Sequence, residues 1–149
     1  MRMPAAEARR RFAGAAVARL ATVSPAGHPH IVPVTFALDP GPGQGDRIYT
    51  AVDDVKPKTT TGLQRLRNIR AQPRVALLAD HYAGDWSQLW WVRADGQAAV
   101  LDSPAGQVRP LRLLAARYPQ YAAQPPPGPV ITIRVDRWTG WAATGGAAG

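Results

Sequence analysis

The chain has 149 residues and no cysteine. Its length suits one domain with its own core, and the lack of cysteine excludes disulfides, thiol nucleophiles and cysteine-ligated metals, so any redox chemistry has to come from a cofactor. The formal net charge of +8 predicts an anionic partner, which composition leaves open as nucleic acid, a membrane surface or a phosphorylated small molecule.

Targeting and membrane segments are not indicated by the sequence. Residues 1–12 are too charged for a signal peptide, and the longest apolar stretches, such as residues 75–79, have the length of a strand. We therefore expect a cytoplasmic protein without a membrane partner.

The first 38 residues predict a helix and a β-hairpin. Residues 4–13 form the helix, and residues 17–23 form a strand that ends in the turn sequence Ser24-Pro25-Ala26-Gly27. Residues 30–38 alternate between two faces and form the second strand, in which Pro33 indicates an edge or a bulge.

A loop, a strand, a helix and another strand are predicted next. Residues 39–46 are rich in glycine and proline and form the loop, and residues 47–52 form the third strand. After the polar stretch 53–61, a helix begins near a threonine cap and ends before Pro73, with one apolar side made of Leu63, Leu66 and Ile69. Residues 74–80 are a strongly apolar fourth strand.

The region from residue 81 to 101 predicts a turn and a long strand. Residues 81–87 form the turn, and the strand-like runs 89–94 and 97–101 are separated by Asp95-Gly96, which indicates either a hairpin or a bulge.

The last third of the chain predicts a helix, a loop and a strand. Residues 104–117 are helical, and Pro110 suggests that the regular helix begins only there, with Val108, Leu111 and Leu114 on one stripe. Residues 118–129 form a proline-rich loop, and residues 130–138 alternate cleanly as a strand.

These elements predict a mainly β fold, an antiparallel β-barrel with inserted helices. We expect one domain over residues 1–141, followed by a disordered tail of small residues at 142–149.

A basic, threonine-rich segment leads into the second helix. It holds the only two lysines of the chain, Lys56 and Lys58, although the chain has sixteen arginines. Ammonium groups, threonine hydroxyls and the free N–H groups of a helix N-terminus all favour an anion, so the segment outlines a phosphate site. The alternative is a solvated loop in which Asp53 and Asp54 pair with the lysines.

Three stretches together resemble the pyridoxamine-phosphate-oxidase-like superfamily. They are the strand end Tyr49-Thr50, the helix exit and strand of residues 66–78, and the opening hairpin of residues 18–34. The resemblance covers nearly the whole chain. It implies an FMN-binding split β-barrel that works as a homodimer with the cofactor at the interface.

Residues 56–60, 79–82 and 85–93 are most similar to the branch of that superfamily that uses the deazaflavin coenzyme F420. The resemblance implies phosphate contacts from Lys56, Lys58, Thr59, Thr60 and Arg65, and a ring system bordered by Ile48, Tyr49 and Thr50. Because Arg65 stands where the family often has lysine, the division of work between Lys58 and Arg65 stays open. A deazaflavin is more anionic than FMN and suits the charge of +8, while FMN is the alternative cofactor.

Five tryptophans form a second signal. The neighbours Trp90 and Trp91 point to opposite faces of a strand. One interpretation is core and dimer packing, and the other places Trp90 or Trp141 at the edge of the cofactor.

Other kinds of site find little support. His28 and His30 lack a third ligand at a recognisable spacing, so we expect turn histidines and no metal. The serines lack a nucleophile signature. The arginines are scattered along the chain without a binding motif, so no nucleic-acid partner is expected.

The resulting hypothesis is an F420-dependent oxidoreductase that moves a hydride between the deazaflavin and an unknown small-molecule substrate. An FMN-dependent enzyme of the same fold is one alternative. Because no general acid or base stands out, a non-catalytic flavin or deazaflavin carrier or sensor is the other, and catalytic residues stay unassigned.

Overall fold

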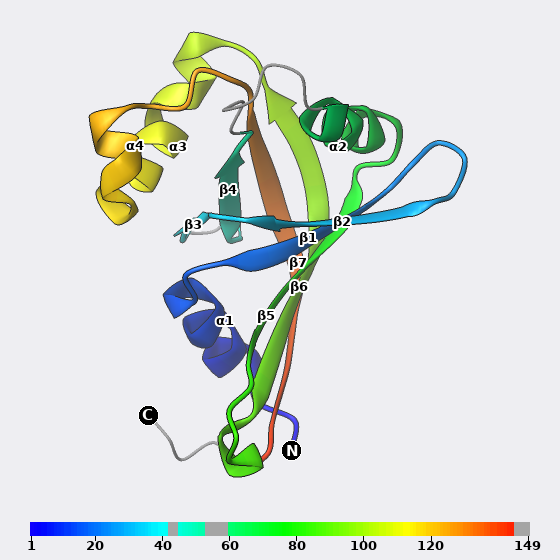
Figure 1. Cartoon of the computed structure of the whole chain (residues 1–149), viewed down its shortest axis with the longest axis vertical. Helices are drawn as coiled ribbons and strands as arrows, with labels where there is room; N and C mark the ends of the chain where they lie inside the picture. The colour runs from blue at the N-terminus through cyan, green and yellow to red at the C-terminus, as the bar shows by residue number, and fades with distance from the viewer. Residues whose placement is uncertain (42–44, 53–59, 145–149) are drawn as a thin grey trace.

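The computed structural model of the protein describes residues 1–41, 45–52 and 60–144 (Figure 1). Its strands form one antiparallel sheet in the order β2-β1-β5-β6-β7-β4-β3. They are β1 (Ala18–Val23), β2 (Pro29–Val34), β3 (Ala37–Asp39), β4 (Arg47–Ala51), β5 (Arg74–His81), β6 (Trp90–Leu101) and β7 (Val130–Ala142). The predicted mainly β class is confirmed.

The helices lie at both ends of this sheet (Figure 1). They are α1 (Ala5–Gly14), α2 (Thr60–Ala71), the 3-10 turn η1 (Trp86–Gln88), α3 (Pro104–Arg117) and α4 (Pro119–Ala123). In Figure 1, α2, α3 and α4 surround the upper end, whereas α1, η1 and both chain termini occupy the lower half. Within the described part of the chain, no helix is both long and apolar enough to cross a membrane.

The sheet curls on itself, and a short connection shows why. β2 and β3 are the two outermost strands of the sheet, yet only Thr35 and Phe36 separate them in the chain. Three Cα–Cα steps from the end of β2 to the start of β3 reach at most about 11 Å, so the two edges of the sheet have to come together as in a barrel.

The predicted strand 30–38 is therefore two strands. At Phe36 the backbone leaves the ladder: its N–H donates to the Tyr118 hydroxyl at 3.1 Å, and its carbonyl accepts from Arg117 Nη1 at 2.7 Å. Side chains at the end of α3 thus satisfy backbone groups that a continuous strand would pair with a neighbour. The Phe36 ring is fully buried at the same point.

Aromatic and aliphatic side chains fill the space inside the curled sheet. Phe12 of α1 packs against Phe36 and Trp138, with ring centroids at 4.6 and 5.2 Å. Leu20, Leu77 and other alternate strand residues are fully buried around them. This core fixes α1 against β6 and β7.

The C-terminal helices differ from the sequence prediction. α3 begins at Pro104 and not at Pro110, because the Ser103 hydroxyl accepts a hydrogen bond from the Gly106 N–H at 3.1 Å and caps the helix. The expected apolar stripe is wrong at Val108, which is 63% exposed. The predicted loop 118–129 contains the short helix α4.

The last strand is longer than predicted and ends in the core. β7 runs to Ala142, which is 5% exposed, so the ordered domain reaches at least that residue. Residues 145–149 of the predicted tail lie outside the described residues.

Candidate functional site

The helix that follows the lysine segment is anchored to the sheet by a polar chain. On α2, the Gln64 amide donates to Asn68 Oδ1 at 2.7 Å, and the fully buried Asn68 donates to the Thr22 hydroxyl of β1 at 3.0 Å. Leu66 and Ile69 are buried on the same helix. Buried and satisfied contacts of this kind hold the helix in one orientation.

Arg65 of α2 carries a buried side-chain donor that the described residues leave without an acceptor. Its side-chain Nε is buried and has no hydrogen-bond partner within the described part of the chain. Burial lowers the pKa of Arg65 from its usual value, but a guanidinium stays charged at neutral pH. A buried donor without a partner costs free energy, and an anion bound beside α2 would supply the missing acceptor.

The predicted ring-bordering residues on β4 point in two directions. Ile48 is fully buried in the main core. Thr50, two residues further, is also fully buried, and its hydroxyl finds no partner among the described residues. Tyr49 points to the opposite face, because successive strand residues alternate, and its hydroxyl donates to Asp39 Oδ2 at 2.8 Å.

Asp39, Tyr49 and Arg109 form a polar cluster that sequence reasoning missed. Arg109 of α3 donates to both Asp39 oxygens at 2.8 Å. The two bonds from Arg109 are the main reason that the pKa of the Asp39 carboxyl is lowered, while burial raises the pKa of Tyr49. A cavity of about 280 Å³ lies beside the cluster, with Arg47 in its wall.

Trp90 lies at the opposite end of the sheet from α2. It pairs with His81 at the end of β5, whereas Arg74, close after α2, pairs with Gln97. Trp90 and Gln97 are seven residues apart on β6, roughly 23 Å at about 3.3 Å per residue. One chain therefore does not bring Trp90 to the α2 segment (Figure 1).

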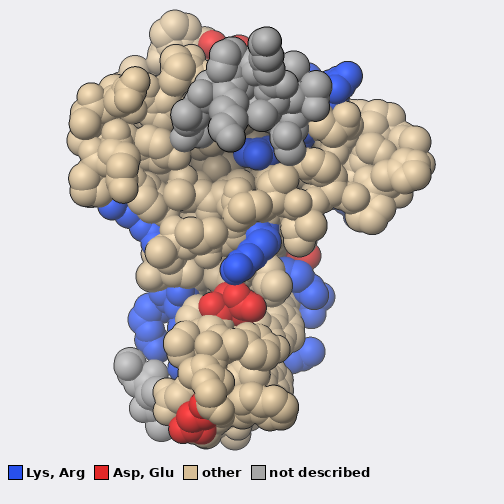
Figure 2. Space-filling model, in the orientation of Figure 1, with Lys and Arg blue, Asp and Glu red and all other residues tan. Residues whose placement is uncertain are grey.

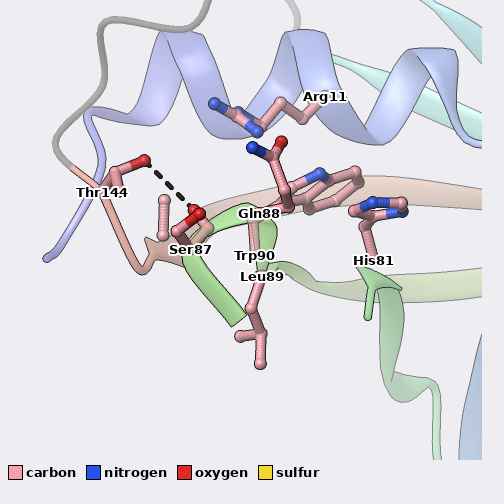
Figure 3. A pocket seen from close by; sticks show the side chains of 8 residues that line it. Arg11, His81, Ser87, Gln88, Leu89, Trp90 and Thr144 are labelled. Carbon is pink, nitrogen blue, oxygen red and sulfur yellow. Dashed lines mark hydrogen bonds between the residues drawn. The ribbon is translucent and has the colours of Figure 1, made fainter. Parts of the chain in front are cut away.

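Trp90 instead lines a pocket of about 220 Å³ next to η1 and α1. Arg11 reaches over this pocket from α1, and His81 and Trp90 line its other side (Figure 3).

Positive charge on the surface is divided among several places. On the face seen in Figure 2, Lys and Arg side chains lie in separate groups in both the upper and the lower half, with acidic side chains between some of them. Among the described residues, no group of three or more His, Asp or Glu side chains is placed to hold a metal ion.

A family model, pyridoxamine 5'-phosphate oxidase, matches residues 5–142. The chain belongs to the pyridoxamine 5'-phosphate oxidase family. The resemblance noted in the sequence is thereby confirmed, and so is the split-barrel fold of pyridoxamine 5'-phosphate oxidases.

Solved structures share this fold at low sequence identity. A conserved hypothetical protein from Mycobacterium tuberculosis is 21% identical, with a TM-score of 0.72 over 99% of this chain and 95% of that one. An FAD-binding protein from Mesorhizobium loti is 19% identical, with a TM-score of 0.69 over 94% and 93%. A heme storage protein from Vibrio cholerae is 13% identical, with a TM-score of 0.64 over 94% and 95%. No curated protein matches the chain.

In this member of the pyridoxamine 5'-phosphate oxidase family, the predicted cofactor residues fall into three groups. Lys56, Lys58 and Thr59 lie outside the described residues, and Thr60 is the first residue of α2. Arg65 and the β4 residues flank that segment in the chain. Trp90 stands apart at the far end of the sheet.

Proposed function

We propose that the chain is an oxidoreductase that binds a flavin-type coenzyme beside the start of α2, with the deazaflavin F420 as the preferred coenzyme and FMN as the alternative. Membership of the pyridoxamine 5'-phosphate oxidase family supports a cofactor of this type, as does the FAD-binding relative from Mesorhizobium loti. Lys56, Lys58, Thr59 and Thr60 would complete the phosphate contacts.

The orphaned Arg65 Nε is the observation that carries this proposal. It is a buried donor on a charged side chain in the second turn of α2, and it has no hydrogen-bond partner among the described residues. Helix N-termini favour anions through their free N–H groups. A coenzyme phosphate satisfies both the arginine and the helix, so the residues present fit the group.

Charge favours the deazaflavin over FMN. The chain carries a net charge of +8, and the deazaflavin adds a tail of carboxylates to its phosphate. Long-range attraction between opposite charges raises the rate of association of such a ligand. The same charge accommodates FMN, which is why direct titration is needed.

The coenzyme supplies the hydride chemistry, and the chain supplies binding and orientation. Arg65 and the α2 N-terminus hold the phosphate end, and the Asn68–Thr22 hydrogen bond fixes the helix that carries Arg65. Hydride transfer depends on such orientation more than on a dedicated acid or base.

Replacing Arg65 by Met should weaken coenzyme binding about 10- to 100-fold, because one hydrogen bond to a charged group contributes about 1.5–3 kcal/mol. The measurement is a fluorescence titration of the purified protein with F420, FMN and FAD. Arg67→Met is the matched control, since Arg67 is an exposed neighbour on α2 whose guanidinium reaches Gln64 at 3.3 Å. The control should bind like the unmodified protein.

Three outcomes of this titration change the proposal. Tight FMN binding with no response to F420 would select the alternative coenzyme. Equal affinity in both arginine variants would remove Arg65 from the site. Undiminished affinity after replacing both Lys56 and Lys58 by Ala would remove the lysine segment as well.

A coenzyme carrier or sensor is the second candidate. The heme storage relative from Vibrio cholerae supports it, because that protein has the same fold and a storage role. Reduced deazaflavin, incubated with the protein and a panel of quinones, enones and nitro compounds, separates the two. An enzyme oxidises the coenzyme only when an acceptor is present, whereas a carrier binds it without turnover.

We further propose that two chains form a homodimer with the coenzyme at their interface. The separation of Trp90 from α2 within one chain supports this arrangement. In a dimer, Trp90 of one chain can approach α2 of the other.

A further inference from the structure

The cavity of about 280 Å³ at the β3–β4 edge of the sheet is lined by two arginines from different elements. Arg47 is the first residue of β4, and Arg109 belongs to α3, which lies beside β3 and β4 (Figure 1). Asp39 and Tyr49, both buried, complete the polar part of the wall. The Arg109 side chain is 57% exposed, so a ligand can reach it from solvent.

The carboxylate of Asp39 is already neutralised by Arg109. Its two oxygens accept hydrogen bonds from Nε and Nη2 of Arg109, both at 2.8 Å, and Oδ2 also accepts from the Tyr49 hydroxyl at 2.8 Å. A guanidinium has five N–H donors, so Arg109 keeps donors for a further acceptor. The pair also shows that a carboxylate is the acceptor that fits an arginine fork in this cavity.

Arg47 brings a positive charge to the cavity without an ion pair of its own. Among the described residues, its guanidinium makes no hydrogen bond and no ion pair. After the hydrogen bonds from Arg109, the charge of Arg47 also contributes to the lowered pKa of Asp39. One carboxylate therefore faces two guanidinium groups.

A third guanidinium stands next to Arg47 on the same face of the sheet. Arg47 of β4 and Arg134 of β7 are directly opposite each other, so their side chains share a face and start about 5 Å apart. Like charges in this position destabilise a sheet. Arg134 reaches its nearest carboxylate, Asp136, only at 3.7 Å. An anion bound at Arg47 would relieve this repulsion.

We propose that this cavity binds a small organic dicarboxylate, with one carboxylate on Arg47 and the other on Arg109. Each planar guanidinium matches the two oxygens of a carboxylate. Because Asp39 lies between the two guanidinium groups, two separate carboxylates fit them better than one compact anion such as phosphate. The cavity of about 280 Å³ is just below the roughly 300–1,000 Å³ typical of drug-sized ligands, which suits a chain of about four carbons.

This site goes beyond the proposed coenzyme function. Arg47 begins β4, whereas the chain enters the lysine segment only after Ala51, at the other end of that strand. Four residues of strand span roughly 13 Å. Arg47 and Arg65 can therefore be replaced separately, each with its own binding measurement.

Succinate is the probe, compared with succinamate and inorganic phosphate. Succinamate keeps the length of succinate but replaces one carboxylate by an amide, and inorganic phosphate keeps the charge in a compact shape. Calorimetric titration of the intact protein should give an affinity for succinate at least about tenfold higher than for either, as expected when a charge-assisted hydrogen bond is lost. Added salt should weaken the binding, because it screens the arginines.

Variants of Arg47 test the residue that the chain leaves without an ion pair. Arg47→Met should lower succinate affinity at least about tenfold, and Arg47→Lys should restore part of it, because the charge returns without the fork. Arg112→Met is the matched control. Arg112 is an exposed arginine of α3 that does not line the cavity, so its replacement removes the same charge and should leave the affinity unchanged.

Thermal unfolding separates a binding role of Arg47 from a structural one. Because Arg47 has no hydrogen bond to lose and has a like-charged neighbour, Arg47→Met without ligand should unfold at about the same temperature as Arg112→Met. A ligand that binds only the folded chain stabilises it. Succinate should therefore raise the unfolding temperature of the unmodified protein and of Arg112→Met, but not of Arg47→Met.

Four results would overturn the proposal. They are no binding of succinate, equal or tighter binding of succinamate or inorganic phosphate, equal affinity in the two methionine variants, and displacement of succinate by F420 or FMN, which would assign the arginines to the coenzyme. Arg65→Met should leave succinate affinity unchanged, and Arg47→Met should leave coenzyme affinity unchanged. A failure of this site is thereby distinguished from a failure of the proposed function.

Discussion

Asp39 stands at the end of β3, where its carboxylate accepts two hydrogen bonds from Arg109 and one from Tyr49. The residue is 7% exposed. A buried carboxylate with three donors is held in its charged form. The cluster therefore joins α3 to the edge of the sheet.

Asp39→Asn should destabilise the protein by about 1–3 kcal/mol at neutral pH, because an amide cannot accept all three hydrogen bonds and leaves a buried donor unpaired. The pKa of Asp39 lies below its ordinary value of 3.8. Its stabilising effect is therefore complete above pH 3.8 and is lost as the pH falls through the lower folded-state value. Urea unfolding of both proteins at neutral and acidic pH should show the difference in stability shrinking in acid; a constant difference would contradict this assignment.

The sequence identified some of the candidate site residues and missed others. The family resemblance placed Arg65 in an anion site, and this assignment stays a prediction; the structure adds that its Nε is buried without a hydrogen-bond partner among the described residues. Arg109 was not singled out, because nothing local connects it with Asp39, seventy residues away. The alternation of β4 also separates Tyr49 from its neighbours Ile48 and Thr50.

β6 shows what one glycine does within an element. Its register against β7 shifts between Asp95 and Gly96, which confirms the bulge interpretation of that dipeptide. A Cβ at Gly96 would collide with the Arg134 carbonyl oxygen and would approach Ile133 Cγ2 to 3.0 Å. The bulge therefore depends on the missing side chain.

Gly96→Ala should destabilise the protein by about 1–3 kcal/mol, because backbone atoms of β7 would have to move. Gly84→Ala is the matched control, since a Cβ there meets nothing within 4 Å, and its effect should stay within about 0.5 kcal/mol. Denaturant midpoints of the two variants give the comparison. A Gly96 variant as stable as the control would show that the β7 backbone can move away from the added Cβ at little cost in stability.

Residues 30–38 illustrate the limits of pattern at the scale of an element. Their alternation correctly indicated extended chain, and the turn before them is confirmed, with Gly27 at a φ of +86°. The break at Thr35 and Phe36 had no local signal, because it depends on Tyr118 and Arg117. Those side chains approach from more than eighty residues away.

At the scale of the molecule, the curled sheet separates two candidate sites. In Figure 1, α2 lies at the upper end of the sheet, and the pairing of Trp90 with His81 puts Trp90 and its pocket at the opposite end. This separation is the physical reason for proposing that a second chain completes the coenzyme site.

Light scattering after size-exclusion chromatography should give twice the 16.0 kDa of one chain, because the proposed coenzyme site needs residues from both copies. The coenzyme should strengthen the dimer, since a ligand that binds only the assembled form shifts the equilibrium toward it. A chain that stays monomeric while binding the coenzyme tightly would contradict the shared site.

By itself, the sequence determined the mainly β class, the family, the position of most strands and the bulge in β6. Alternation of apolar and polar residues, turn residues and glycine set the backbone conformation through neighbours in the sequence, so these features can be predicted from short segments. Only the tertiary structure decided that β2 and β3 are opposite edges of one curled sheet, that Arg109 pairs with Asp39, and that Trp90 lies far from α2. Those features depend on contacts between distant parts of the chain, which no local pattern encodes.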